Sequence, residues 1–134
     1  MGMGIALITP FKKDGSVDFD ALERLVEYQI ENGTDYLVIL GTTAETPTLT
    51  EEEKDEIARV VIAKTNKRLP IVMGIGGNNT RTVVEKIKST DLSQVDAVLS
   101  VVPYYNKPSQ EGIYQHYKAI AQATSTPIVL YNVP

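Results

Sequence analysis

Short apolar runs alternate with longer amphipathic segments along the chain, and this alternation restricts the fold more than any other feature. The apolar runs start about 30 residues apart, one strand–helix–strand step, and cover residues 5–8, 36–40, 71–73, 97–102 and 128–131. Most are rich in Val, Ile and Leu without a period of two, which is typical of parallel strands buried on both faces. The pattern therefore predicts a parallel α/β fold.

Four amphipathic segments separate these strands. We expect helices to begin after Asp18, at Thr50, after Thr80 and near Ser109. The second start is the most explicit, because Thr50 and Glu53 form the spacing of a capping box, in which each side chain binds the other residue's backbone amide. Gly33 is a plausible stop for the first helix, since glycine readily adopts the left-handed conformation that ends helices.

Two architectures fit this order of elements. One is a doubly wound five-stranded sheet, which usually ends with a helix over its last strand. The other is the first half of a TIM (β/α)8 barrel, with strands 1–5 and helices 1–4, because a whole barrel needs about 250 residues and this chain has 134. The pattern alone leaves the two nearly even. The absence of a final helix slightly favours residues 1–134 as the N-terminal part of a single barrel domain, truncated after strand 5.

The composition narrows the class of protein. A net charge of −4 argues against a nucleic-acid partner, whose phosphates require a basic surface. No apolar run approaches the length that spans a bilayer, and the N-terminus does not resemble a signal peptide. With no cysteine and only one histidine, His116, we expect no metal site and no disulfide. These features indicate a soluble cytoplasmic protein with no cofactor evident.

The chemistry is expected where parallel strands end, since α/β folds bind ligands there. After the second strand, Thr42 and Thr43 follow Gly41, and two hydroxyls beside a glycine can hold a carboxylate. An ordinary helix-entry loop rich in hydrogen-bonding residues explains the same letters.

Tyrosines follow the fourth and fifth strands: Tyr104, Tyr105 and Tyr131. A phenol both donates and accepts, so threonine and tyrosine hydroxyls together could pass a proton. Adjacent residues at a strand end point to opposite sides, so only one of Tyr104 and Tyr105 can face the binding site at the strand ends. Alternatively, the tyrosines fill the edge of the core with wet hydroxyls.

Three further features favour ordinary interpretations. The glycines at 74–77 lack the third glycine and the lysine of phosphate-binding loops, so they predict a tight turn with Asn78 as a polar contact. His116 lies in the fourth helical segment and is interpreted as a surface or packing histidine. Lys107 is expected to be solvated, since it lacks the apolar setting that activates a lysine amine.

Several stretches together resemble the dihydrodipicolinate synthase family over nearly the whole chain. They are ITPF at 8–11, GTTAE at 41–45, VPYYNKPSQEG at 102–112 and LYNVP at 130–134. The resemblance implies a (β/α)8 barrel and a lyase that condenses pyruvate with aspartate 4-semialdehyde, through a lysine Schiff base, in diaminopimelate and lysine biosynthesis. It also implies a homo-oligomer built as a tight dimer, or as a dimer of such dimers in a homotetramer.

The resemblance assigns roles to five of the residues above. Thr42, Tyr105 and Tyr131 would form a proton relay, with Tyr131 as the main donor, and Thr43 would hold the pyruvate carboxylate. In the family the second tyrosine of the pair, here Tyr105, reaches into the neighbouring subunit's site, and Tyr104 would line that dimer interface.

Other positions limit what the chain can do. Asn78 and Tyr104 match positions where lysine-inhibited members bind lysine, but Glu51, Lys54 and Thr82 stand where such members often carry His or Glu, which argues against feedback control. The Schiff-base lysine would lie beyond residue 134, so the 134-residue chain alone is expected to be inactive. The alternatives are another Schiff-base aldolase, similar to N-acetylneuraminate lyase, and a non-catalytic doubly wound binding domain.

Overall fold

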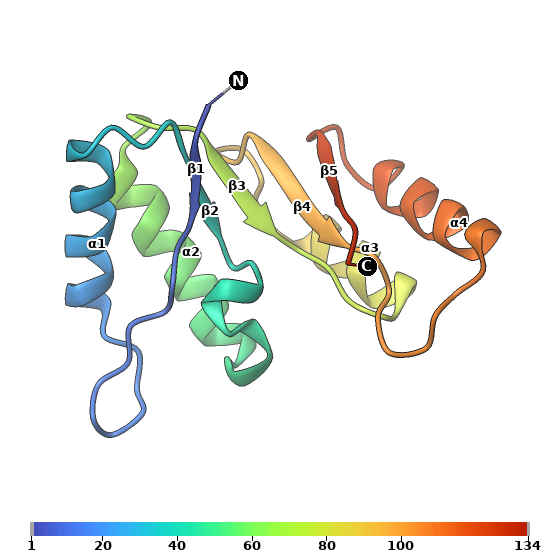
Figure 1. Ribbon diagram of the computed structural model, residues 1–134, viewed down its shortest axis with the longest axis horizontal. Helices are drawn as coiled ribbons and strands as arrows, with labels where there is room; N and C mark the ends of the chain where they lie inside the picture. Colours follow the sequence, from blue (N-terminus) through green and yellow to red (C-terminus); the bar gives the residue numbers. More distant parts are fainter. Residues whose placement is uncertain (1, 134) are drawn as a thin grey trace. The chain divides into compact units, whose positions relative to one another are not determined.

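The computed structural model describes residues 2–133, in which strands and helices alternate as the sequence predicts (Figure 1). The chain forms two compact units, which we call the N-terminal unit (residues 1–72) and the C-terminal unit (residues 73–134). The strand order is β1-β2-β3-β4-β5. A doubly wound sheet reverses its strand order at a switch point, whereas barrel strands follow the sequence. The order therefore identifies the first half of a (β/α)8 barrel and excludes the doubly wound alternative.

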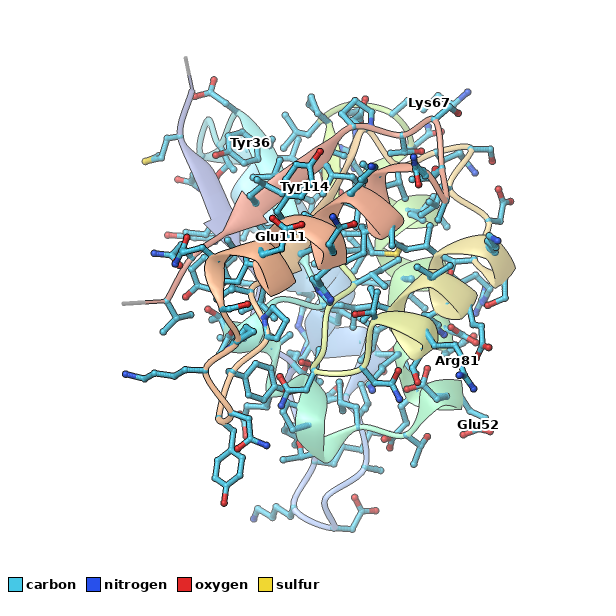
Figure 2. All side chains as sticks on the ribbon, turned by 90° about the vertical axis from the view of Figure 1, so that its right-hand side faces the viewer. Tyr36, Glu52, Lys67, Arg81, Glu111 and Tyr114 are labelled. Atoms are coloured by element: carbon cyan, nitrogen blue, oxygen red, sulfur yellow. The ribbon has the colours of Figure 1, made fainter. Side chains whose placement is uncertain are left out.

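The N-terminal unit contains two parallel strands and two helices before the third strand begins. Its elements are β1 (Gly4–Ala6), α1 (Phe19–Glu31), β2 (Tyr36–Ile39), two short 3₁₀ turns and α2 (Glu51–Thr65). β1 pairs with β2 in register Ile5 with Leu37, and a side chain at Gly4 would overlap the ring of Tyr36, which Figure 2 labels. The deepest apolar side chains come from α1, β2 and α2 and include Leu22, Val26, Leu37, Ile39 and Val61.

The C-terminal unit continues the alternation. It holds the second half of β3 (Ile71–Gly74), then α3 (Thr80–Ser89), β4 (Ala97–Val101), α4 (Gln110–Ala121) and β5 (Ile128–Tyr131). β4 pairs with β5 in parallel, with Val98 opposite Ile128. Val98 and Ile120 are fully buried, whereas Leu130 on β5 is 61% exposed. Tyr114 and Glu111 lie on the exposed face of α4, as Figure 2 shows.

Helix starts follow the local rules read from the sequence. Asp18 caps α1, and Thr50 and Glu53 form the complete capping box of α2. Ser109 caps α4. The third start is one residue earlier than predicted, because Asn79 is the cap and its side chain accepts from the first amides of α3. Each cap satisfies amides that have no partner inside the helix.

Strand boundaries agree with the prediction within one or two residues, and β5 agrees fully. The main difference is at β1, which ends at Ala6, although the amide of Leu7 still donates to the carbonyl of Val38. Gly33 has φ +81° just beyond α1, as expected for a residue that stops a helix. The sequence did not predict the antiparallel bridge between Phe11 and Val17.

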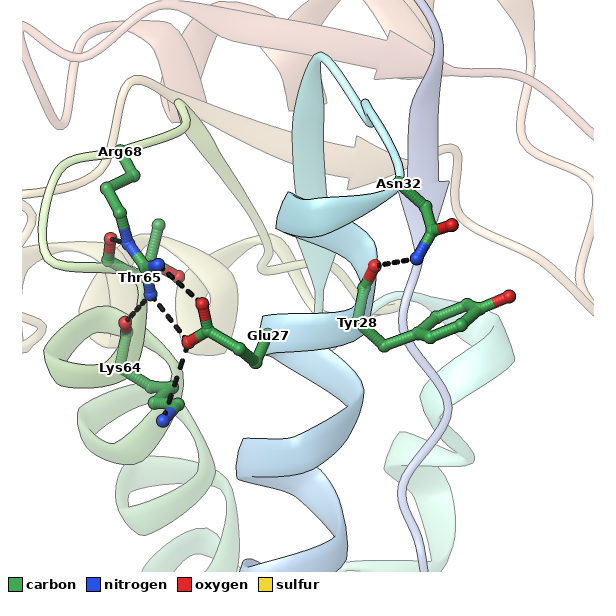
Figure 3. Close-up of polar contacts among 6 residues, drawn as sticks. All are labelled: Glu27, Tyr28, Asn32, Lys64, Thr65 and Arg68. Carbon is green, nitrogen blue, oxygen red and sulfur yellow. Dashed lines mark hydrogen bonds and ion pairs between the residues drawn. The ribbon is translucent and has the colours of Figure 1, made fainter.

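An ion-pair cluster joins α1 to the C-terminal end of α2 (Figure 3). The Arg68 guanidinium donates to both Glu27 oxygens, at 2.6 and 2.9 Å, and also to the carbonyls of Lys64 and Thr65. Lys64 adds a charge 3.5 Å from the same carboxylate. The hydrogen bond from Arg68 is the main reason that the pKa of Glu27 falls to about 2.

Candidate active site

The segment after β2 forms two consecutive 3₁₀ turns. Thr42–Ala44 makes the first turn and Thr46–Thr48 the second, and Glu45 joins them in the left-handed conformation at φ 56°. A non-glycine residue rarely adopts that conformation unless its surroundings impose it. The two turns therefore form a defined structure that presents Thr42 and Thr43 just past the strand.

The side chains of Thr42 and Thr43 are exposed, whereas Ala44 is only 2% exposed. Two exposed hydroxyls on a fixed turn can donate to a small anion. The carbonyl of buried Ala44 accepts the hydroxyl of Thr9 at 2.7 Å, which ties the turn to the segment after β1. Thr9 was not predicted to be a site residue, although the ITPF motif contained the signal: a single hydroxyl among apolar residues.

The tyrosine pair lies beyond the end of β4, not on it. β4 ends at Val101, and the following segment has no regular structure. The expectation that strand alternation decides which of the two tyrosines faces the site is therefore wrong, because side chains alternate in this way only along an extended strand. Tyr105 instead has φ 73° and is 91% exposed, and Tyr104 is 51% exposed.

Asn78, after β3, anchors this segment. Its Oδ1 accepts the backbone amide of Tyr104 at 2.7 Å, which confirms the prediction of a polar contact. Nearby, a side chain at Gly76 would come within 2.9 Å of the amide nitrogen of Val101. Glycine is needed there because the backbone passes close to β4. Lys107 is exposed, as predicted.

Tyr131 is the last residue of β5 and is 39% exposed. Its carbonyl accepts the amide of Val102 at 2.8 Å and the hydroxyl of Tyr117 at 3.3 Å. The same Tyr117 hydroxyl lies 3.1 Å from the carbonyl of Ser100 on β4. Tyr117 therefore bridges the ends of β4 and β5. Burial raises the pKa of Tyr117, which keeps the hydroxyl protonated as a donor.

Tyr117 was not predicted to be a site residue. The available signal was that a tyrosine on a buried stripe needs a partner for its hydroxyl. Tyr131 ends β5 and Tyr105 follows β4, and these two strands pair in parallel, so both tyrosines belong to the same edge of the sheet. Thr42 and Thr43 belong to the N-terminal unit, and their meeting with the tyrosines stays a prediction.

His116 packs in the interior of the C-terminal unit, so the structure selects the packing interpretation. It is 3% exposed, and its Nδ1 lies 2.8 Å from the hydroxyl of Thr80 at the start of α3. Burial lowers its pKa, which favours the neutral ring. Across residues 2–133, no group of three His, Asp or Glu side chains is arranged to hold a metal ion. Among the helices described, none has the length and apolar character needed to cross a membrane.

Comparisons with known proteins agree on one family. The model of the dihydrodipicolinate synthetase family matches residues 1–134, and the chain belongs to that family. A 4-hydroxy-tetrahydrodipicolinate synthase from Parabacteroides distasonis is 71% identical over 133 residues, and one from Phocaeicola vulgatus is 69% identical. Each match covers 99% of this chain and 45% of the relative, so the chain spans less than half the length of these proteins.

Solved structures give the same result. The chain resembles the chloride-inhibited dihydrodipicolinate synthase of Acinetobacter baumannii, in complex with pyruvate, with a TM-score of 0.95 and 51% identity. It resembles the dihydrodipicolinate synthase DapA-2 of Bacillus anthracis with a TM-score of 0.93 and 49% identity. Each of these two matches covers 99% of this chain and 46% of the chain in the solved structure.

Proposed function

We propose that this sequence is the N-terminal half of a 4-hydroxy-tetrahydrodipicolinate synthase, which condenses pyruvate with aspartate 4-semialdehyde in lysine and diaminopimelate biosynthesis. The 71% identity with a synthase of that name, over 99% of the chain, carries the proposal. The hydroxyl-bearing residues at the ends of β2, β4 and β5 support it, because they supply the groups that such chemistry needs. The enzyme is cytoplasmic and requires no metal.

The reaction begins when a lysine amine attacks the carbonyl carbon of pyruvate. A carbinolamine forms, and its hydroxyl leaves as water once it is protonated, which gives the imine. A phenol close to that oxygen can donate the proton, and we assign this role to Tyr131 with Thr42 and Tyr105 as relay. Loss of a proton from the methyl carbon gives an enamine, which attacks the aldehyde carbon of the second substrate, and the resulting alkoxide takes up a proton.

Thr43 is assigned to the pyruvate carboxylate. The exposure of both threonine hydroxyls on a turn held from below supports this role. The lysine is not assigned to any residue here, since none of the lysines in the described residues 2–133 ends a core strand. The 134-residue chain by itself should therefore not catalyse the reaction.

The exposure of Tyr105 supports a shared site between subunits. A side chain that is 91% exposed, on a backbone at φ 73°, makes almost no contact with its own chain. We assign Tyr105 to the active site of a neighbouring subunit and Tyr104 to the interface of that tight dimer, two of which form a homotetramer. Asn78 and Tyr104 are adjacent through a hydrogen bond, so a lysine-inhibition site there would share this segment.

A chimera tests the proposal. Residues 1–134 are joined to the remainder of the Parabacteroides distasonis synthase, and the purified protein is treated with pyruvate and borohydride. Intact mass should rise by one reduced pyruvate adduct per chain, and a chelator should not prevent it. A folded chimera that forms no adduct, or one whose activity a chelator abolishes and a divalent ion restores, would refute the proposed mechanism.

A further inference from the structure

Thr9 occupies a buried position that an apolar side chain would fill equally well. It is 4% exposed, like Leu7 two residues earlier, whereas Ile8 between them is 53% exposed. Thr9 is therefore as deeply buried as the apolar Leu7, although both residues follow the end of β1 at Ala6. A hydroxyl in such a place costs free energy unless it is hydrogen-bonded.

The hydroxyl of Thr9 has one partner, the carbonyl of Ala44, at 2.7 Å and 35 positions further along the chain. Ala44 closes the first 3₁₀ turn, and Glu45 then reverses into the left-handed conformation. Because the turn does not continue regularly past Glu45, the carbonyl of Ala44 lies outside the repeating hydrogen bonds of a helix. Thr9 supplies the donor for this buried carbonyl.

The bond acts on the turn that presents the candidate carboxylate site. Thr42 and Thr43 are the two other residues of the turn that Ala44 closes. A shift of Ala44 would therefore move both exposed hydroxyls. Positions of binding groups matter at the scale of an ångström, because hydrogen bonds weaken steeply with distance and angle.

We infer that Thr9 is a positioning residue for pyruvate: its buried hydroxyl fixes the turn on which Thr43 meets the substrate carboxylate. The inference rests on the proposed function, which supplies the substrate and the role of Thr43. It adds a residue that would never contact pyruvate and acts only through the backbone of Ala44.

Two substitutions at Thr9 separate the hydroxyl from the side chain's shape. Thr9→Val keeps the branched shape and removes the donor, whereas Thr9→Ser keeps the donor and loses a methyl group. Thr34 offers a matched control in the same unit, because it is 5% exposed and its hydroxyl donates to Gln29 at 2.9 Å, outside the turn. Thr34→Val removes one buried hydroxyl without touching Ala44.

The three variants are made in the chimera described above, and steady-state kinetics are measured with each substrate varied. Thr9→Val should raise the KM for pyruvate about 5- to 10-fold, on the scale of one lost hydrogen bond. The KM for the aldehyde should change by less than about twofold. Thr9→Ser should restore most of the pyruvate KM, and Thr34→Val should leave both KM values unchanged.

The outcomes are distinct. If the unmodified chimera folds but forms no pyruvate adduct, the proposed function fails and the inference fails with it. If the chimera forms the adduct, the inference alone is overturned when Thr9→Val and Thr34→Val give the same pyruvate KM, or when Thr9→Ser is as impaired as Thr9→Val.

Discussion

The helix pairs of the two units are joined by different interactions, ionic in one unit and neutral in the other. In the N-terminal unit a charged cluster around Glu27 and Arg68 joins the helix pair at the surface. In the C-terminal unit the helix pair shares a neutral hydrogen bond between Thr80 and His116, a histidine that is 3% exposed. Surface ion pairs are weak and screened by salt, whereas a buried hydrogen bond depends on both partners being present.

At the strand ends the two units differ in the opposite sense: the N-terminal unit uses a buried hydrogen bond and the C-terminal unit an exposed one. The turn of the N-terminal unit is tied from below by buried Thr9, and its Ala44 is 2% exposed. The tyrosine segment of the C-terminal unit is exposed, and its tie to the side chain of Asn78 lies at the surface. A firmly held turn suits a binding group, and an exposed segment suits a side chain that serves another subunit. Under the proposed function, Thr43 of the N-terminal unit binds pyruvate, and Tyr105 and Tyr131 of the C-terminal unit transfer protons together with Thr42.

The largest expected effect tests the proton-transfer role proposed for the tyrosines. In the chimera, Tyr131→Phe or Tyr105→Phe should lower kcat by about 10²-fold or more, the scale for losing a general acid–base group. Tyr114→Phe is the control, since Tyr114 is 58% exposed on α4 and has no assigned role in the site. Steady-state kinetics at saturating substrate measure the effect. Turnover of Tyr131→Phe close to that of the Tyr114→Phe control would refute the relay.

A smaller effect should follow when the exposed hydrogen bond between Asn78 and the backbone of Tyr104 is removed. Asn78→Ala removes the acceptor for the Tyr104 amide, and kcat should fall about 3- to 10-fold, the value of one modest hydrogen bond. Asn78→Asp retains an acceptor oxygen and should lose less. The pyruvate KM, which depends on the other unit, should stay constant in both. A rise in that KM with no change in kcat would contradict the different roles given to the Thr9–Ala44 and Asn78–Tyr104 hydrogen bonds.

A pH experiment compares the helix pairs. Because burial lowers the pKa of His116 from its ordinary 6.5, the unfolded state binds the proton first as pH falls. The free energy of unfolding should be highest above pH 6.5 and should decrease below it. His116→Asn can still pair with Thr80 but does not titrate, so its stability should be flat through that range. Denaturant unfolding at several pH values measures this, and equal pH dependence of both proteins would contradict it.

The smallest effect is expected at the ion-pair cluster. The pKa of Glu27 is lowered from 4.5 to about 2, so its stabilisation is complete above pH 4.5 and is lost as pH falls toward 2. Glu27→Gln should flatten that part of the stability curve, and 1 M salt should reduce the difference between the two proteins, since the carboxylate is partly exposed. A difference that salt leaves unchanged would show that the cluster behaves as a buried pair.

Much of the fold could be predicted from the sequence because its signals are local. Apolar runs mark buried strands, and Thr50 with Glu53 marks a helix start within four residues. The strand-end residues Thr42 and Tyr131 were likewise placed correctly relative to β2 and β5. The chemical roles predicted for Thr42 and Tyr131 remain proposals.

The errors arose where a local rule was extended past its element. Strand alternation was applied to Tyr104 and Tyr105, which follow the strand, but β4 ends at Val101 and the rule does not extend to them. The contribution of Tyr117 was missed because a helix stripe does not reveal which carbonyls its hydroxyl will meet. Those carbonyls, on Ser100 and Tyr131, lie 17 and 14 positions away in the sequence.

The sequence by itself determined the order and type of the elements, the capping of the helices and the set of hydroxyl-bearing residues at the strand ends, because hydrophobic period and capping act over a few residues. Only the tertiary structure decided how those residues are held. The bond from Thr9 to Ala44 spans 35 positions and the bond from Asn78 to Tyr104 spans 26. Such partners are chosen when the packing of strands and helices brings distant backbone groups together, and no local pattern encodes that choice.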